Sequence, residues 1–358
     1  SDGECRIRNT LISEDTLLTL QALRQMGIDI DDTAKDQIIV AGRSGRLKPC
    51  ADPIFLGNSG TSMRLLTAVA ALGQGTFTLT GTDRMAERPI QDLIVALEQL
   101  GVRIHTKNRN GCPPVEITGK KISGGSVSIN CRTSSQYLSA LLLIAPYTDR
   151  GLEIRVTEGP VSRPYVDMTV NVMDKFGVTV EREGYDRFRV AGGQAYRAGS
   201  YAVEPDGSQA GYFWAAAAVC GTEIKVKGVT ADSCQGDVNF AKLLATMGCA
   251  MATEPDGITV CGRHLRAADV DMGDMPDMVP TLAVVAAFAE GTTIIRNVSH
   301  LKAKESDRLV AVVNELVKMG IDARCSADEL IVTGGKPHGA EIETYGDHRI
   351  AMSFAVAG

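Results

Sequence analysis

Small and basic residues stand just before an apolar helical pattern in the segment Leu56-Gly-Asn-Ser-Gly-Thr-Ser-Met-Arg64. Glycine and serine let backbone N–H groups approach an anion at a helix N-terminus, where the helix dipole is favourable. A plain N-cap by Ser59 or Thr61 would explain the same residues. Because the Gly-Lys-Ser/Thr of a Walker loop is absent, the segment predicts either a different anion site or a capped helix.

Arginine recurs at the next helix entry, in Arg84-Met-Ala-Glu-Arg88-Pro89. Pro89 suits the first turn of a helix. Arg88 beside a helix N-terminus would add charge-assisted, bidentate bonding to a phosphate or a carboxylate. The alternative is a surface arginine that Glu87 neutralises.

Hydroxyl and amide side chains fill two further helix entries. Ser134, Ser135 and Gln136 precede an apolar helical pattern and could bind a polyhydroxylated, phosphorylated ligand. Capping explains one serine but not the whole cluster. Ser162 and Tyr165 have a similar place before an amphipathic helix.

Carboxylates that could move protons lie in the second half of the chain. Asp277 stands at the entrance of the buried helix predicted over 281–288, either as a cap or as a general base. Glu305 stands between Lys304 and Arg308, where it could transfer a proton while the two cations hold an anion. A surface pair of Glu305 with Arg308 is the alternative, although such a pair contributes only about 0.3–0.5 kcal/mol.

One more arginine stands at a helix entry, in the segment Thr344-Tyr-Gly-Asp347-His348-Arg349. Asp347 or His348 could orient Arg349. The remaining histidines have no metal-ligand spacing, so the sequence does not support a metal site.

A repeat of roughly 72 residues positions these segments. Five helical patterns end in a glycine, and these glycines lie 71 to 76 residues apart: Gly27, Gly101, Gly177, Gly248 and Gly320. A glycine there is the expected left-handed stop that releases a helix into a strand. A second set recurs in phase after Ala- and Leu-rich helices, at Gly75, Gly151, Gly221 and Gly291. Each unit therefore reads as buried helix, strand, amphipathic helix, glycine and two short strands.

Six such units cannot share one core, so the repeat predicts two domains with three repeats each. We expect a first domain over 1–204 and a second over 205–358, with the crossing near Val203-Glu-Pro-Asp206. Ala-rich helices such as 212–219 are apolar almost all round and should be buried on every side. The expected fold class is α/β, with helices packed inside and sheets outside.

The phase of the repeat also predicts missing ends. Gly3-Glu-Cys-Arg-Ile-Arg-Asn9 resembles Gly291-Thr-Thr-Ile-Ile-Arg-Asn297, so the chain is expected to open just after a buried helix that it lacks. Residues 355–358 end where a strand should begin. A sequence trimmed at both ends is therefore expected, and a complete protein with abrupt termini is the alternative.

Composition excludes several classes of protein. The 358 residues are 44% hydrophobic and 22% charged, which is ordinary for a globular protein. With a net charge of −6 and charges spread along the chain, no nucleic-acid partner is expected. No apolar stretch approaches the ~20 residues of a membrane span. Nine scattered cysteines without a CxxC favour a reducing cytoplasm.

Polar or charged groups thus stand at helix entries in nearly every repeat. If equivalent ends of both domains face one cleft, their dipoles and arginines sum into an anion-focusing site. An enzyme that handles two anionic substrates would need this arrangement.

These motifs together resemble the 5-enolpyruvylshikimate-3-phosphate synthase family. The resemblance runs in order along the chain through Leu56–Arg64, Arg84-Met-x-x-Arg-Pro-Ile90, Ser134-Ser-Gln136, Pro276-Asp277, Lys304-Glu-Ser-Asp-Arg308 and Asp347-His-Arg-Ile-Ala-Met352. It implies two domains of three inverse α/β units each. It also implies transfer of the enolpyruvyl group of phosphoenolpyruvate to the 5-hydroxyl of shikimate 3-phosphate, in aromatic amino acid biosynthesis.

The resemblance implies a role for each matching residue. Asp277 would take the proton of the 5-hydroxyl, and Glu305 would protonate the methylene carbon. Residues that match phosphoenolpyruvate ligands are Gly60, Arg88, Gln136, Arg308 and Arg349. Residues that match shikimate 3-phosphate ligands are Ser134, Ser135, Gln136, Ser162, Tyr165, Asp277 and Lys304. No metal or organic cofactor is implied, and a monomeric, cytoplasmic enzyme without membrane or nucleic-acid partners is expected.

Some family features are absent from this sequence. The family's N-terminal Asp-Lys-Ser-x-x-x-Arg segment and its C-terminal lysine segment have no match, so the chain as given is expected to be inactive or severely impaired. His300 stands where some members place asparagine, and no role is assigned to it. The family inhibitor glyphosate should bind a completed chain, because Gly60 leaves room beside phosphoenolpyruvate.

Two alternatives remain at this point. UDP-N-acetylglucosamine enolpyruvyl transferase shares the implied fold and chemistry, but it should carry a reactive cysteine in the loop that corresponds to 84–88, and this loop has none. A non-catalytic repeat module that binds anionic partners would have no need of Glu305.

Overall fold

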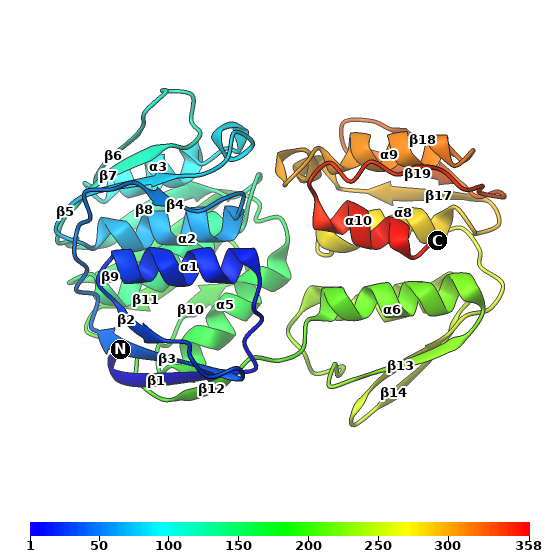
Figure 1. The fold of residues 1–358 in the computed structure, drawn as a ribbon. Helices are drawn as coiled ribbons and strands as arrows, with labels where there is room; N and C mark the ends of the chain where they lie inside the picture. Colours follow the sequence, from blue (N-terminus) through cyan, green and yellow to red (C-terminus); the bar gives the residue numbers. More distant parts are fainter. The chain divides into compact units, whose positions relative to one another are not determined.

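The computed structural model describes all residues from 1 to 358 and divides into two compact units, Ser1–Val203 and Glu204–Gly358. Both units combine helices with sheets, so the predicted α/β class is confirmed (Figure 1). Each unit has a hydrophobic core of its own. No helix has both the length and the apolar character that a bilayer crossing requires.

The first unit contains three four-stranded sheets. In spatial order their strands are β12 (Ser200–Ala202), β1 (Asp2–Arg8), β3 (Gln37–Arg43) and β2 (Asp29–Asp31); β4 (Ile54–Phe55), β5 (Gly75–Thr80), β7 (Val115–Gly119) and β6 (Arg103–Thr106); and β8 (Gly125–Asn130), β9 (Gly151–Glu158), β11 (Arg187–Ala191) and β10 (Glu181–Glu183). The first pair of strands is parallel in each sheet, β12 with β1, β4 with β5 and β8 with β9. The remaining pairs are antiparallel.

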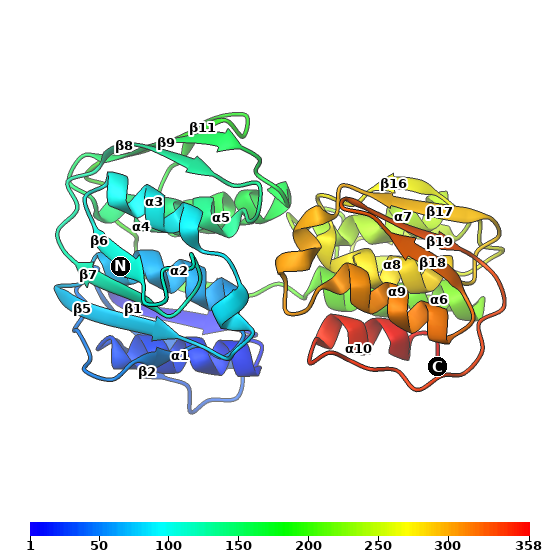
Figure 2. The ribbon, with the colours of Figure 1, turned by 90° about the horizontal axis from the view of Figure 1, so that it is seen from above.

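Helices of the first unit connect these strands. They are α1 (Glu14–Gln25), α2 (Gly60–Ala71), α3 (Gln91–Gln99), α4 (Gln136–Ile144) and α5 (Arg163–Lys175), with the short 3₁₀ helices η1 (Met85–Glu87) and η2 (Ala145–Tyr147). Helices α2 and α4 pack against each other and against the inner faces of the β4–β7 and β8–β11 sheets (Figure 2). The predicted arrangement of helices inside and sheets outside therefore holds for this unit.

The second unit contains a three-stranded and a four-stranded sheet. In spatial order the strands are β13 (Glu223–Lys227), β15 (Gly257–Cys261) and β14 (Ala250–Glu254), and β16 (Asp269–Asp271), β17 (Thr292–Arg296), β19 (Glu329–Thr333) and β18 (Asp322–Cys325). Its helices are α6 (Gly207–Cys220), α7 (Phe240–Thr246), α8 (Val279–Ala286), α9 (Arg308–Lys318) and α10 (His348–Ala355), with η3 (Gly236–Asn239), η4 (Pro276–Met278) and η5 (Ser299–Ala303). Within this unit α8 packs against α6, α9 and α10 (Figure 1).

Burial of the Ala-rich helices follows their composition. Every residue of α8 is buried, because Val, Leu and Ala occupy all faces of the helix. In α6, Trp214 is fully buried, but Phe213 is 57% exposed. The prediction of burial on every side is therefore wrong for α6, which shows one face to solvent.

The repeat is visible in the backbone. All nine glycines of the two predicted sets have positive φ angles, between 64° at Gly221 and 116° at Gly75. The strands β1 and β17 both end at an asparagine in the left-handed region, Asn9 with φ 58° and Asn297 with φ 61°. Asparagine tolerates this region better than most residues. The matched segments that end in Asn9 and Asn297 thus share a local conformation as well as a sequence pattern.

Candidate active site

In the first unit, two guanidinium groups lie against the start of α2. A Cβ atom added to Gly60 would lie 2.5 Å from Nη2 of Arg88 and 2.7 Å from Nη1 of Arg64. Ser59 also caps the helix, since its Oγ accepts a hydrogen bond from the backbone N–H of Ser62. The capping alternative is therefore confirmed, and it coexists with a concentration of positive charge at the helix N-terminus. Only glycine leaves room for this close approach.

Arg88 is buried rather than a surface residue. Arg88 is 3% exposed, and its Nη1 donates to the backbone oxygen of Asn58 at 2.6 Å. Glu87 forms its ion pair with Arg84 at 2.8 Å, so the surface-pair alternative for Arg88 is wrong. Pro89 does not begin a helix either, because α3 starts after the N-cap Ile90.

Gln136 connects the entries of α2 and α4. Its Oε1 accepts from Nη1 of Arg64 at 2.7 Å, and its Nε2 donates to Oγ1 of Thr61 at 2.8 Å. Ser134 supports the turn, since its Oγ accepts from the backbone N–H of Gln136 at 3.3 Å. Ser135 is buried at the N-cap position of α4 but makes no side-chain cap bond. The structure therefore brings the Gly60, Arg88 and Ser134–Gln136 segments together.

Ser162 and Tyr165 lie at the entry of the neighbouring helix α5. Ser162 is the N-cap residue, is buried and has left-handed φ and ψ angles of 55° and 50°. The backbone oxygen of Tyr165 accepts from Thr169, whose Oγ1 lies 2.7 Å from Oγ of Ser139 in α4. This contact joins α5 to α4, so the two hydroxyl-bearing helix entries belong to adjacent helices.

In the second unit, three cations converge on Asp277. Its Oδ1 accepts from Nζ of Lys304 at 3.2 Å and from Nη1 of Arg308 at 2.9 Å, and its Oδ2 accepts from Nη2 of Arg349 at 3.4 Å. Asp277 lies in η4 and makes no capping bond to α8. The cap interpretation of Asp277 is therefore wrong, because the carboxylate points at cations rather than at backbone N–H groups.

Arg308 is the centre of this cluster. It is 2% exposed. Nη2 donates to Oε2 of Glu305 at 2.7 Å, and Nε donates to Oδ2 of Asp347 at 2.8 Å. A hydrogen bond from Oγ of Ser306 to Asp347 closes the buried side. The predicted Glu305–Arg308 pair forms, but in the interior rather than on the surface.

Asp347 begins α10 as well as holding Arg308. Its Oδ1 accepts from the backbone N–H of Arg349 at 2.9 Å, as an N-cap does. The guanidinium of Arg349 extends to Oη of Tyr212 at 3.3 Å and to Asp277. Asp347 therefore fixes the start of the helix that carries Arg349, in agreement with the prediction that it orients this arginine.

The pKa shifts of Asp277 and Arg308 follow from their burial and from their ion pairs. Burial alone would raise the pKa of Asp277, but Lys304, Arg349 and Arg308 hold this pKa well below its usual range. Burial also opposes the charge of Arg308, yet Glu305, Asp277 and Asp347 raise its pKa above the ordinary value. Asp277 and Arg308 therefore both stay ionised across the physiological pH range.

Two further buried groups lie near this cluster: sequence reasoning missed Asp237 and assigned no role to His300. Asp237 in η3 is 6% exposed and its Oδ1 has no hydrogen-bond partner. Burial, followed by repulsion from Asp277, raises its pKa to about 7. His300 in η5 is buried with both ring nitrogens lacking a partner, and burial together with Lys304 lowers its pKa to about 4.

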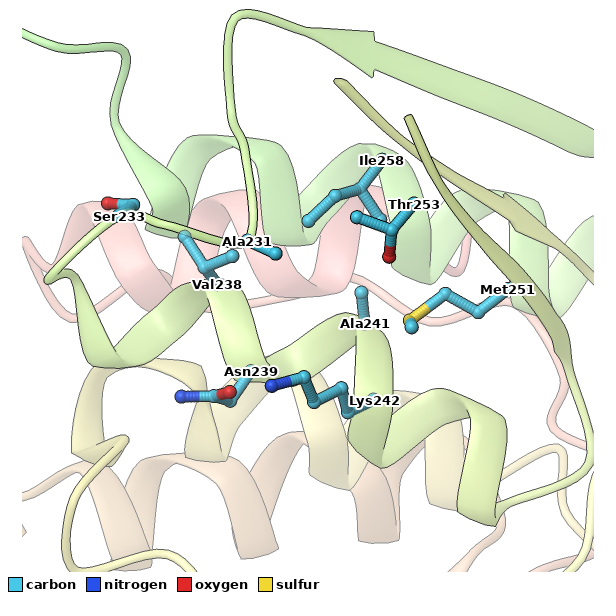
Figure 3. A pocket seen from close by; sticks show the side chains of 9 residues that line it. All are labelled: Ala231, Ser233, Val238, Asn239, Ala241, Lys242, Met251, Thr253 and Ile258. Atoms are coloured by element: carbon cyan, nitrogen blue, oxygen red, sulfur yellow. The ribbon is translucent and has the colours of Figure 1, made fainter. Parts of the chain in front are cut away.

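A pocket elsewhere in the second unit contains none of the predicted site residues. It encloses about 90 Å³ beside η3, α7 and the β13–β15 sheet (Figure 3). Its lining consists of Ala231, Ser233, Val238, Asn239, Ala241, Lys242, Met251, Thr253 and Ile258. The candidate active site is thus defined by the two side-chain clusters and not by this pocket.

Comparison with known proteins decides the family. A family model described as EPSP synthase (3-phosphoshikimate 1-carboxyvinyltransferase) matches residues 1–358. The chain belongs to the EPSP synthase family.

Relatives of known name agree with this EPSP synthase assignment. The chain is 43% identical to the 3-phosphoshikimate 1-carboxyvinyltransferase of Syntrophobacter fumaroxidans over all of the chain and 85% of that protein. It is 42% identical to the chloroplastic enzyme of Arabidopsis thaliana over all of the chain and 72% of that protein. A solved EPSP synthase of Acinetobacter baumannii matches with a TM-score of 0.81 and 30% identity, over all of the chain and 84% of that structure.

Sequence reasoning on this EPSP synthase missed Arg64 and Tyr212 as parts of the site. Arg64 was visible only as the end of the Leu56–Arg64 motif, although an arginine within an apolar helix is itself a signal that its charge has a partner. Tyr212 gave no such signal, since a tyrosine in an Ala-rich helix reads as core. Its contact with Arg349 joins residues 137 positions apart in the sequence, so it depends on the fold.

Proposed function

We propose that Asp277 and Glu305 move the protons in this 3-phosphoshikimate 1-carboxyvinyltransferase, and that the 358-residue chain as given is severely impaired. As a transferase of the shikimate pathway, it transfers the enolpyruvyl group from phosphoenolpyruvate to shikimate 3-phosphate. The single observation that supports the residue roles is the convergence of Lys304, Arg308 and Arg349 on Asp277. Glu305 accepts a hydrogen bond from the guanidinium of Arg308 in the same cluster.

The first step forms a carbon–oxygen bond. The 5-hydroxyl oxygen of the sugar adds to C2 of phosphoenolpyruvate, Asp277 accepts the hydroxyl proton and Glu305 delivers a proton to the methylene carbon. A general base works best when its pKa is near the operating pH. Anionic substrates that take over the hydrogen bonds of Arg308 and Arg349 to Asp277 would raise the low pKa of this carboxylate and so strengthen it as a base.

The second step restores the double bond. The tetrahedral ketal phosphate loses inorganic phosphate by cleavage of its carbon–oxygen bond, and Glu305 takes a proton from the new methyl group. Arg308 and Arg349 stabilise the charge on the leaving phosphate. Because their positions are fixed by Asp347 before substrate arrives, this is electrostatic preorganisation rather than covalent catalysis.

Residues of the first unit supply further ligands in this proposal. Gly60, Arg88 and Gln136 bind phosphoenolpyruvate, because the helix dipole of α2 and a buried guanidinium favour its negative charge. The hydroxyl groups of Ser134, Ser135, Ser162 and Tyr165, the amide of Gln136, and the charges of Asp277 and Lys304 bind shikimate 3-phosphate. Donors and acceptors on two adjacent helix entries suit a phosphorylated sugar-like ring.

Four finer properties belong to the same proposal. The enzyme acts as a monomer in the cytoplasm, without nucleic acid or membrane as partner; its nine free cysteines suit a reducing compartment. Glyphosate inhibits it, since Gly60 leaves no side chain between the α2 backbone and the Arg88 guanidinium. Weak inhibition at low phosphoenolpyruvate would contradict the inhibitor proposal.

Replacement of Glu305 tests the assignment of the proton donor. Glu305→Gln keeps the shape and a hydrogen-bond acceptor for Arg308 but cannot donate a proton to carbon. Loss of a general acid should lower kcat by about 10²- to 10⁴-fold. The substitution is made in the natural protein. The matched control is Glu329→Gln, which alters an exposed partner of Arg296 in the same unit. Unchanged turnover in Glu305→Gln would refute the role.

A further inference from the structure

A buried carboxylate outside the proposed catalytic set lies two helical turns beyond Arg308. Glu315 in α9 is 0% exposed. Its Oε1 accepts from Oη of Tyr345 at 2.8 Å, and its Oε2 accepts from the backbone N–H of Glu343 at 3.0 Å and from Nζ of Lys318 at 2.8 Å. Two of these three donors come from the segment that leads into α10, so Glu315 fastens that segment to α9.

The fastened segment makes a strained turn. Tyr345 has a φ of 56° and the next residue, Gly346, a φ of 61°, both in the left-handed region. A bulky residue adopts this conformation only where its surroundings over-determine it. The backbone N–H of Tyr345 donates to Oε1 of Glu343 at 3.0 Å, and its hydroxyl is held by Glu315. Tyr345 is therefore fixed in the turn by its backbone N–H and by its side-chain hydroxyl.

This turn delivers Asp347 to the cluster. The backbone N–H of Asp347 donates to the oxygen of Thr344 at 2.9 Å. From there its carboxylate accepts from Nε of Arg308 at 2.8 Å and from the backbone N–H of Arg349 at 2.9 Å. The conformation of the turn thus sets the position of Asp347. Through Asp347 it determines where Arg308 is held and where α10, the helix that carries Arg349, begins.

The links form a closed loop on one rigid element. Arg308 and Glu315 both belong to α9, seven residues apart and so about 10 Å along the helix axis. Glu315 holds Tyr345, the chain continues through Gly346 to Asp347, and Asp347 returns to Arg308. A turn attached to one helix at two points cannot shift without breaking one attachment.

We propose that Glu315 is a positioning residue for phosphoenolpyruvate binding: through Tyr345 it fixes the turn 343–347, which sets the positions of Arg308 and Arg349. This inference rests on the proposed function, in which these two arginines bind phosphoenolpyruvate. Glu315 itself touches no substrate. Its loss therefore weakens the binding of phosphoenolpyruvate more than that of shikimate 3-phosphate, because most of the proposed shikimate 3-phosphate ligands lie in the first unit and only Asp277 among them is bonded to the two arginines.

Three substitutions in the natural protein test this role. Glu315→Ala removes both hydrogen bonds that Glu315 accepts from the turn. Tyr345→Phe removes the hydroxyl bond to Glu315 and the 3.4 Å bond from Asn314 but keeps the bond from the backbone N–H of Glu343. Glu315→Gln can still accept from Glu343 and can donate its amide to the tyrosine hydroxyl. We expect KM for phosphoenolpyruvate to rise at least fivefold in Glu315→Ala and at least threefold in Tyr345→Phe. In Glu315→Gln it should stay within twofold of wild type. In Glu315→Ala and Tyr345→Phe, KM for shikimate 3-phosphate should rise less than KM for phosphoenolpyruvate.

A measurement without substrate accompanies the kinetics. The Nε–H of Arg308 is buried and bonded to Asp347, so its NMR signal reports on this contact directly. The signal should shift in Tyr345→Phe and keep its position in the control Glu254→Ala, which removes an exposed partner of Lys225 instead. Should Glu315→Ala fail to fold, Tyr345→Phe decides the matter alone.

The outcomes separate this inference from the function on which it rests. If the variants lose thermal stability but both KM values and the Arg308 signal stay at the wild-type values, Glu315 is merely structural and the proposal is wrong. If wild type itself shows no dependence on phosphoenolpyruvate, the proposed function fails instead. A parallel rise in both KM values would also overturn the role, because it would indicate general loosening of the fold.

Discussion

Replacing Asp237 by asparagine gives a stability change whose sign depends on pH. The carboxyl group in η3 is 6% exposed, and its Oδ1 has no hydrogen-bond partner. Burial and then repulsion from Asp277 raise its pKa from 3.8 to about 7, against the opposing effects of Arg349 and Lys304. The folded protein therefore keeps a proton on Asp237 under conditions in which the unfolded chain has already lost it.

The sign follows from this difference in bound protons. Between pH 4 and pH 7 the folded state binds more protons than the unfolded state, so the free energy of unfolding falls as pH rises. With a folded pKa near 7, the loss between pH 5 and pH 8 is about 3 kcal/mol, taking about 1.4 kcal/mol for each unit. Asparagine does not titrate, so Asp237→Asn escapes this loss. Relative to wild type, the variant gains about 3 kcal/mol between pH 5 and pH 8.

Urea unfolding at pH 5 and pH 8 measures the effect, with the fluorescence of Trp214, the only tryptophan, reporting on the second unit. Asp256→Asn is the matched control: this exposed carboxylate pairs with Lys225, which lowers its pKa. It is ionised in both states throughout that range, so its substitution should add no pH dependence. A relative stability of Asp237→Asn that is the same at both pH values would refute the reasoning.

Two further predictions concern the entry of α2. In Gly60→Ala the new Cβ would lie 2.5 Å from Nη2 of Arg88 and 2.7 Å from Nη1 of Arg64, so both guanidinium groups must move. KM for phosphoenolpyruvate should rise roughly tenfold, or about 1.4 kcal/mol. Unchanged steady-state kinetics would contradict this prediction. Arg64→Met removes the 2.7 Å bond to Gln136. It should weaken the binding of both substrates by about 1 kcal/mol, because the half-buried amide oxygen of Gln136 loses a charged donor. Calorimetric titration of each substrate measures the change.

The sequence predicts the elements well because their signals are local. A glycine in the left-handed region ends a helix wherever it occurs, so Gly27 and Gly248 mark the repeat without knowledge of the fold. Side chains at helix entries, such as Arg88 and Gln136, are visible for the same reason. The segments that carry the candidate site therefore follow from residue types and spacing.

The contacts within the site depend on packing and could not be predicted in this way. Asp277 has the residue pattern of a cap, and only the return of the chain at Arg308 and Arg349 turns it into an ion-pair partner. Glu87 is adjacent to Arg88 in sequence, yet it pairs with Arg84 three residues earlier. Neighbours along the chain are poor predictors of partners when one of them is buried. The expectation of a shared cleft stays a prediction.

Charge balance in the second unit explains which carboxylates a substrate can replace. The cluster holds three cations, Lys304, Arg308 and Arg349, and three carboxylates, Asp277, Glu305 and Asp347. An anion that binds to these arginines competes with the carboxylates already paired with them. The side chain of Asp347 is 0% exposed, whereas those of Asp277 and Glu305 are 16% and 22% exposed.

Asp347 is therefore a permanent counter-ion that holds Arg308 in place. Its removal would leave the buried Nε–H of Arg308 without its partner, at a cost of about 1–3 kcal/mol. Asp277 and Glu305 are the exchangeable partners. They are also the two groups that the proposed reaction requires to gain and lose protons. In the proposed reaction, exchange of partners would couple substrate binding to activation. An anion that displaces Asp277 and Glu305 from the arginines would free the same carboxylates to act as base and acid.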